Sequence, residues 1–296
     1  MGRLVKLAAS VGAAAILMAG TSAIAAAAAP AAPAKAAPAK AAARKAPAAR
    51  GHGRVDLARL GGHPNLNGIW QVMNSANWDL EPHDAAQANA DPAELGAIGA
   101  EPPGLGVVEG GTIPYLPAAV KQRDDNHAAA PKADPEAACY LPGIPRATYM
   151  DHPFQIIQSG GDDMLIAYEY ASANRVVYMK PVEVPPIDTW MGTSYGQWEG
   201  NTLKVTTLSQ NAMTWMDRAG NYLTETGSVT ERFTLIDPDH IAYTATIADP
   251  SVYSKPWKIS MTLYRHVEPN AQLLDFRCVP FADQLVYGDL LPKDAK

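Results

Sequence analysis

The first pattern with chemical meaning in this chain of 296 residues is GTSYG at 192–196, which fits the G-x-S-x-G motif of a nucleophile elbow. In that motif the serine follows a buried strand and begins a helix, so that its hydroxyl lies beside oxyanion donors. Ser194 is instead followed by QWEGNTLKVTT, which predicts a strand, a turn and a second strand. The glycines fit bends or bulges at the edge of a barrel. The context therefore argues against Ser194 as a nucleophile.

A group of aromatic and acidic residues around this serine is the main candidate for a site. A cavity walled by aromatic side chains with a few polar groups is the usual composition of a small-molecule site. The alternative is that the tryptophans are core residues and that the acids lie in turns and on the surface. The residues predicted to contact a ligand are Trp190, Tyr195, Trp198, Trp215, Asp217 and Glu231, and Asp188 and Glu225 lie near them in the sequence.

Glu231 stands out because alternation in its predicted strand places it in one stripe with Val229, Phe233 and Leu235. A buried carboxylate costs several kcal/mol unless it is paired, so Glu231 must have either a partner or a function. The neighbouring Arg232 points to the opposite face and is not that partner. If a cavity raises their pKa values, Asp217 and Glu231 are the candidates for a catalytic acid and base.

The sequence favours neither a metal site nor a cofactor. The seven histidines are scattered, and neither H-x-x-x-H nor C-x-x-C occurs in the chain. No glycine-rich phosphate loop precedes a predicted helix, so nucleotide binding has no support.

The beginning of the chain predicts export. Arg3 and Lys6 precede an apolar run at 7–20, and AIA at 23–25 fits a cleavage site, so residues 1–25 form a predicted signal peptide. Residues 26–54 are almost entirely Ala, Pro, Lys and Arg, which predicts a disordered linker. No later apolar stretch is long enough to predict a transmembrane helix. We expect a periplasmic or secreted protein.

The charge of the chain is divided between this tail and the rest. Residues 26–54 carry six basic residues and no acidic ones. Subtracting these six, Arg3 and Lys6 from the 24 basic residues leaves 16 against 30 acidic residues, a net charge of −14. An acidic domain does not suit nucleic acid. The basic tail could associate weakly with the envelope, although a solvated spacer is the simpler interpretation.

Cys139 and Cys278 are the only two cysteines. Disulfides persist in exported proteins, and an even number of cysteines favours a bridge. The alternative is a pair of buried free thiols.

Residues 55–296 are predicted to form one all-β domain. Short β-rich runs separated by turn signals give nine or ten antiparallel strands, beginning in NLNGIWQVMN at 65–74 and ending in QLLDFRC at 272–278. So long a meander closes into a lipocalin-like barrel or forms a strongly curved β-sandwich, because an open sheet would expose its edges. Residues 79–153 are predicted to form a long irregular arm, with one short helix at 117–126.

Several long stretches resemble a large family of exported bacterial proteins with no established activity, mostly from proteobacteria and acidobacteria. The resemblance implies a lipocalin-like, β-rich domain, and NGIWQ is similar to the G-x-W of the first strand of lipocalin-type barrels. Where relatives tend to carry His or Asp, this chain has Gln197, Asn201, Leu223 and Ser228, which favours binding over catalysis. The stretches that carry the resemblance are EGGTIPYLPAA, DPEAACYLPGIPRATYMDHPFQIIQ, TWMGTSYGQWEGNTLKV, TWMDRAGN, VTERF, DPSVYSKPWKISMTLYR and NAQLLDFRCVPFADQLVYG.

Three functions follow from these observations. The first is an exported protein that binds a small amphipathic or apolar ligand. The second is an acid/base hydrolase or isomerase that uses Asp217 and Glu231 inside the barrel. The third is an envelope protein that acts through contacts of its arm. An aromatic-lined cavity would favour the first, two facing carboxylates the second, and a sealed core the third.

Overall fold

The computed structural model describes residues 57–87, 100–130, 132–183 and 186–280. Contacts divide the chain into two compact units, Met1–His52 and Gly53–Lys296. All described residues belong to the second unit. The predicted signal peptide (1–25) and the predicted linker (26–54) lie outside the described residues.

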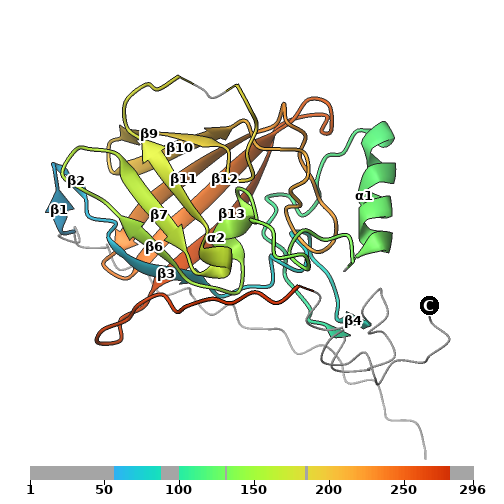
Figure 1. The fold of residues 1–296 in the computed structure, drawn as a ribbon, viewed down its shortest axis with the longest axis horizontal. Helices are drawn as coiled ribbons and strands as arrows, with labels where there is room; N and C mark the ends of the chain where they lie inside the picture. The colour runs from blue at the N-terminus through green and yellow to red at the C-terminus, as the bar shows by residue number, and fades with distance from the viewer. Residues whose placement is uncertain (1–56, 88–99, 131, 184–185, 281–296) are drawn as a thin grey trace, which may run out of the picture. The chain divides into compact units, whose positions relative to one another are not determined.

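Strands of the second unit close into a barrel (Figure 1), which confirms the predicted fold class. Each strand pairs with the next barrel strand along the chain, and the last one returns to the first. Alternation and turn residues located all nine strands in the sequence. They are β3 (Gly68–Val72), β6 (Phe154–Ile157), β7 (Met164–Tyr168), β8 (Asn174–Tyr178), β9 (Thr193–Glu199), β10 (Thr202–Leu208), β11 (Ser228–Asp237), β12 (His240–Ala248) and β13 (Trp257–Arg265).

One pair of barrel strands departs from the predicted antiparallel order. β8 and β9 are parallel, with Val177 opposite Ser194 and Tyr178 opposite Tyr195. A parallel pair requires a long crossover, whereas a hairpin turn produces an antiparallel pair. The segment 179–192 between the two strands is long enough to run back along the barrel, and the barrel is therefore mixed rather than purely antiparallel.

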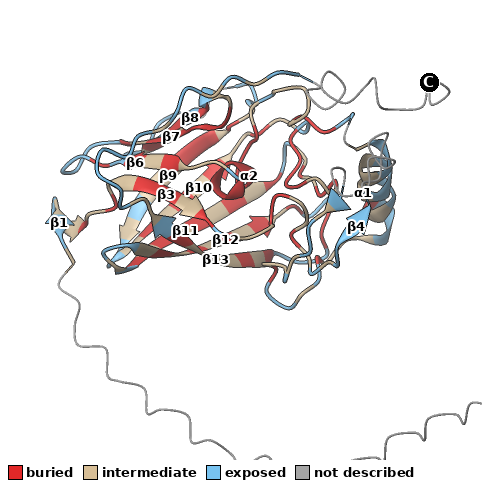
Figure 2. Ribbon diagram, turned by 90° about the horizontal axis from the view of Figure 1, so that it is seen from below, coloured by how far each residue is buried: buried red, intermediate tan, exposed pale blue. Residues whose placement is uncertain are grey.

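The alternation of side chains determines what fills the barrel, because successive residues of a strand point to opposite faces. In β12, Ile241, Tyr243, Ala245 and Ile247 are buried, and the residues between them are only half-buried. Figure 2 shows the same alternation of buried and less buried positions along the barrel strands. The outward positions of β10 to β12 are rich in threonine, which suits the solvated face of a sheet.

The predicted arm contains most of the remaining elements. They are β4 (Ala86–Gln87), β5 (Ala100–Glu101), α1 (Pro117–Ala129) and α2 (Arg146–Tyr149). The helix α1 matches the short helix expected at 117–126, and Pro117 at its first position favours its start. Outside the arm, β1 (Arg59–Leu60) pairs with β2 (His63–Pro64), and η2 (Tyr170–Ser172) follows β7.

Part of the arm lies along β13 and covers its edge. Val108 forms a bridge with Ile259, and the Glu109 N–H donates to the Lys258 carbonyl at 2.8 Å. The Ser260 N–H donates in return to the Val107 carbonyl at 2.9 Å. β3 pairs with β13 only at Leu263 to Arg265, the last three residues of β13. The arm therefore protects the part of the β13 edge that β3 does not reach.

A disulfide joins the arm to the segment that follows β13. Cys139 and Cys278 are bonded with their Cα atoms 5.8 Å apart, as the sequence predicted. The strand predicted at 272–278 is wrong, because these described residues form no strand. Each barrel strand already has two neighbours, and the arm occupies the part of the β13 edge that β3 does not reach, so no edge is left there for a further strand. Residues 266–280 form instead a C-terminal strap, in which the Phe276 ring packs against His152 and Tyr170.

Candidate functional site

Ser194 lies inside the barrel and not at a nucleophile elbow. It is 1% exposed, and β9 continues beyond it into a turn and then β10. Its hydroxyl shares a hydrogen bond of 2.9 Å with Thr207 and accepts a weaker one of 3.4 Å from Arg175. The structure therefore agrees with the strand context that the sequence indicated.

Glu231 has the buried partner that its position demanded. Arg175 of β8 donates from Nη1 to Oε2 at 2.6 Å and from Nη2 to Oε1 at 3.1 Å. The Tyr243 hydroxyl donates to Oε1 at 2.9 Å, and Thr148 adds a contact of 3.4 Å. Sequence reasoning did not identify Arg175, although its place two residues before the buried Val177 was a signal that its side chain points inward.

Arg175 is held in its charged form beside Glu231. Burial by itself lowers the pKa of Arg175, but the attraction of Glu231 outweighs burial and the pKa lies above its ordinary value. Burial first, and then the charge of Glu231, raise the pKa of Tyr243 well above its ordinary value, so Tyr243 stays protonated and donates. A buried ion pair with both partners bonded is a structural element, and neither group is open to a substrate.

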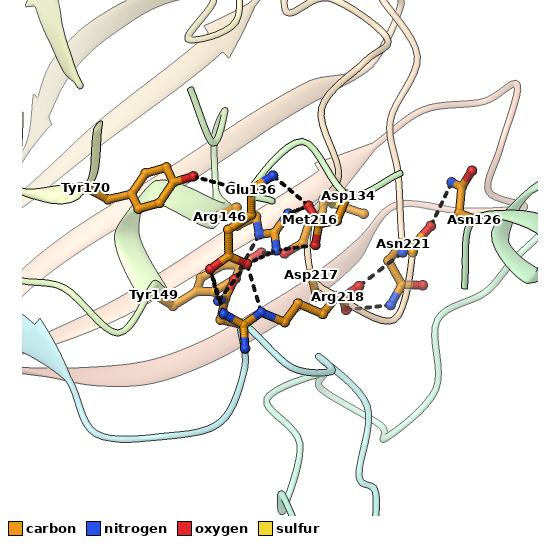
Figure 3. A network of polar contacts seen from close by, with 12 residues as sticks. Asn126, Asp134, Glu136, Arg146, Tyr149, Tyr170, Met216, Asp217, Arg218 and Asn221 are labelled. Carbon is orange, nitrogen blue, oxygen red and sulfur yellow. Dashed lines mark hydrogen bonds and ion pairs between the residues drawn. The ribbon is translucent and has the colours of Figure 1, made fainter. Parts of the chain in front are cut away.

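A second polar cluster ties the arm to the barrel end (Figure 3). Arg146 of α2 is 1% exposed and donates to both oxygens of Asp134 at 2.7 and 2.8 Å. It also donates to Glu136 at 2.7 Å and to Asn77 at 2.8 Å. Arg218 donates to Glu136 at 2.8 and 2.7 Å. We call these five residues the Arg146 network.

Asp217 lies beside this network, in the loop between β10 and β11 (Figure 3). It is completely buried, and its carboxylate accepts hydrogen bonds from the Leu80 N–H at 3.0 Å and from the Asn221 N–H at 3.0 Å. The Asn221 amide donates a further bond at 2.6 Å. Burial, and next the charge of Asp79, raise the pKa of Asp217 to about 7, although these hydrogen bonds oppose the shift.

The two predicted catalytic carboxylates do not face one another. Asp217 is bonded by the loops at the barrel end and Glu231 by side chains inside the barrel, and in the described structure they share no hydrogen-bond partner. Both are completely buried. The arrangement lacks the accessible pair that an acid/base reaction requires.

The predicted aromatic residues are distributed over several places and do not wall one cavity. Trp190 stacks on Tyr140 with ring centroids 4.9 Å apart, whereas Trp198 stacks on His63 of β2 at 4.6 Å. Trp215 is buried in the loop after β10, where it forms a bridge with Tyr222. Tyr195 of β9 lies opposite Tyr178 in the parallel pair. A role of these aromatic residues in ligand binding remains a prediction.

An open cleft of about 570 Å³ lies where the arm meets β12, β13 and the loop between them. We call it the arm cleft. Lys258 pairs with Glu109 at 3.2 Å, and a hydrogen bond from Ser260 and then this pairing lower the pKa of Glu109. The indole N–H of Trp257 is buried and has no hydrogen-bond partner among the described residues. The cleft is lined by Glu109, Gly110, Thr112, Pro114, Thr246, Lys255, Pro256, Trp257 and Lys258.

Sequence reasoning did not find the arm cleft. None of its lining residues is among the predicted site residues, since the arm and the β12–β13 region come together only in the folded chain. The turn glycines of EGGT and the prolines on both sides were present in the sequence, but nothing in either segment shows which other segment it meets.

Neither a cluster of metal-binding side chains nor a membrane-spanning helix is present among the described residues. No group of three or more His, Cys, Asp or Glu side chains there is arranged to hold a metal ion. No helix in this part of the chain is both long and apolar enough to cross a membrane.

Comparisons of the chain with protein-family models, with curated proteins and with solved structures found no match. The closed barrel and the geometry of the arm cleft are therefore the features that bear on function. Membership of a family of exported, lipocalin-like proteins remains a prediction from the quoted sequence stretches.

Proposed function

We propose that this protein is an exported small-molecule-binding protein and that its binding site is the arm cleft. The observation that carries the proposal is the cleft itself. Its volume of about 570 Å³ lies within the range of roughly 300 to 1,000 Å³ that is usual for ligand sites. The predicted signal peptide and the disulfide support export, because disulfides persist outside the cytosol.

The barrel interior is a less suitable place for a ligand. Inward-facing side chains from β3 to β13 fill it, and many of them have no exposed surface. Its polar centre, Arg175 and Glu231, is already neutralised by mutual pairing. A ligand in the interior would have to displace close-packed side chains, which is costly. Examples of these filling residues are Trp70, Phe154, Ile166, Val205, Phe233, Tyr243 and Ile259.

The composition of the arm cleft suits an amphipathic ligand. Pro114, Pro256 and Trp257 offer apolar surface, and Lys255 and Lys258 offer charged donors. Sites of this kind combine an apolar wall with a few polar groups that orient the ligand. The acid/base alternative has less support, because the carboxylates of Asp217 and Glu231 are both completely buried.

The proposal is tested by native mass spectrometry of the protein purified from its own host. Thr246→Tyr places a large side chain in the cleft, whereas Thr244→Tyr adds the same side chain to the same face of β12, outside the cleft lining. We expect the wild type and Thr244→Tyr to retain a small molecule that Thr246→Tyr has lost. Equal retention by both variants would place the ligand elsewhere and overturn the proposal.

A further inference from the structure

We infer that the ligand of the arm cleft is an amphipathic anion, such as a carboxylate with an apolar body, and that Lys255 binds its negative group. This inference rests on the proposed function, and it deepens that proposal by naming the chemical class of the ligand. Three observations support it: the balance of charge in the cleft, the state of its hydrogen-bonding groups, and the apolar surface beside them.

The balance of charge leaves one cation available. Three charged residues line the cleft, and two of them neutralise one another, since the Lys258 ammonium lies 3.2 Å from the Glu109 carboxylate. Ser260 also donates to Glu109, so this carboxylate has two partners of its own. Lys255 is exposed and has no acidic partner within the described part of the chain. The cleft therefore presents a net positive charge.

This local charge contrasts with the rest of the domain. Residues 55–296 contain 16 basic and 30 acidic residues, and basic side chains on the barrel surface are commonly paired. Lys204 and Arg232, for example, both contact Glu199. On so acidic a protein, an unpaired cation is a favourable place for an anion, because the net field disfavours anions elsewhere.

The hydrogen-bonding groups of the cleft point to a ligand that accepts hydrogen bonds. Trp257 contributes its ring to the wall of the cleft, whereas its indole N–H is buried and is not offered to a ligand in the open cleft. The hydroxyl groups of Thr112 and Thr246 also line the cleft. An oxyanion can accept bonds from such donors while the ammonium of Lys255 binds it as a point charge.

The apolar side chains that line the cleft indicate that its ligand also has an apolar part. Pro114 belongs to the arm and Pro256 to the loop before β13, and Trp257 is the first residue of that strand. These side chains cannot bond an inorganic anion. A ligand that covers them gains from the removal of apolar surface from water.

The inference is tested with octanoate and 1-octanol, which share an apolar chain and differ in charge. Binding is followed by the indole N–H resonance of Trp257 in two-dimensional NMR spectra of the mature chain. We expect Lys255→Gln to weaken octanoate about fivefold, the upper range for a partly exposed ion pair, and to change octanol less than twofold. The matched control is Lys204→Gln on β10, which should leave both affinities unchanged.

A second variant and the dependence of octanoate affinity on ionic strength provide two further tests of the inference. Lys258→Gln leaves Glu109 without its ammonium partner in the cleft, so octanoate should weaken at least as much as in Lys255→Gln. Raising NaCl from about 0.05 to about 0.5 M should reduce octanoate affinity and leave octanol unaffected.

The possible outcomes separate the inference from the proposed function. If both probes bind and Lys255→Gln affects them equally, the anion inference is overturned and the cleft remains a binding site. If neither probe shifts the Trp257 resonance and Thr246→Tyr retains the host ligand, the proposed function fails, and the inference fails with it.

Discussion

Inside the barrel, one arginine and one glutamate illustrate how a charged residue is tolerated in a β core. Arg175 and Glu231 are almost completely buried, and each provides the partner that the other requires. The hydroxyl groups of Tyr243 and Thr148 donate further hydrogen bonds to the Glu231 carboxylate. Replacing one partner of such a pair leaves an unpaired buried charge, which is strongly destabilising. Replacing both partners by apolar residues leaves no buried charge and costs much less stability.

Glu231→Gln should therefore destabilise the protein by about 3 to 5 kcal/mol, because Arg175 remains buried without a counter-charge. Urea denaturation measures this change. The control is Glu199→Gln, which removes an exposed partner of Arg232 and should barely move the midpoint. The double variant Arg175→Met with Glu231→Leu should recover most of the loss. A midpoint for Glu231→Gln equal to that of Glu199→Gln would contradict this account.

The stability of the protein should also depend on the titration of Asp217. Its pKa is raised from 3.8 to about 7 in the folded protein, chiefly by burial. The folded state thus holds a proton that the unfolded state releases. The resulting stabilisation is present below the ordinary pKa and disappears as the pH rises through about 7.

We expect the denaturation midpoint of the wild type to fall between about pH 5 and about pH 8, and Asp217→Asn to remove most of this slope. The titration of Glu136 has the opposite effect on the pH dependence of stability. Burial raises its pKa, but Arg146 and Arg218 outweigh burial and lower the pKa to about 2, so its stabilisation disappears at more acidic pH. Identical slopes for the wild type and Asp217→Asn above about pH 5 would show that another group controls stability there.

At the scale of elements, the sequence predicted the barrel strands well because their signal is local. In β11 and β12 every second residue is buried, and this period is readable without knowledge of the neighbouring strands. The predicted strand at 272–278 is also rich in apolar residues, but strand formation needs a free edge as well, and the closed barrel with the arm along β13 offered none. Edges are a property of the assembled sheet.

The candidate site was less predictable for a related reason. The buried position of Glu231 followed from alternation, and alternation also contained a signal for Arg175. The arm cleft depends instead on where the arm crosses β13, and the parallel β8–β9 pair depends on the path of 179–192. The amino-acid composition of the arm and of 179–192 does not predict where these segments run, because their courses depend on contacts between residues far apart in the chain.

The contact between the arm and β13 can be tested through one backbone donor. Glu109→Pro removes the N–H that bonds the Lys258 carbonyl, whereas Glu109→Ala removes only the side chain. Relative to Glu109→Ala, the proline variant should lose about 1 to 3 kcal/mol of stability. The Ser260 amide, which donates to Val107, should exchange its hydrogen faster in the proline variant alone. Equal exchange in both variants would show that the arm is held by other contacts.

At the scale of the whole molecule, the disulfide links two segments that are 139 residues apart in the sequence. Cys139 follows Glu136 of the Arg146 network in the arm, and Cys278 lies in the C-terminal strap beyond Phe276. The strap is anchored further by the Leu274 N–H, which donates to Glu169 at 2.8 Å. One covalent bond thus connects the arm to the strap, and the hydrogen bonds of the Arg146 network connect the arm to the barrel end.

Replacing Cys139 and Cys278 by serine should destabilise the protein by about 2 to 4 kcal/mol, because the bridge closes a long loop and limits the unfolded chain. The two cysteines are separated by 139 residues. Thermal unfolding measures the effect, and reduced wild type should match the double variant. An unchanged midpoint would mean that the noncovalent contacts of the strap are sufficient.

The pairing of β3 with β13 has a consequence for the order in which the barrel assembles as the chain folds. β6 to β13 can join one after another, since each follows its spatial neighbour in the chain and such local pairings form early. Closure then unites Val72 with Leu263, near the two extremes of the described domain, and the entropy of so long a loop delays this step. A chain in which β13 has not yet paired with β3 keeps open sheet edges, which are templates for aggregation. The folding protein is therefore most prone to aggregation just before these two strands pair.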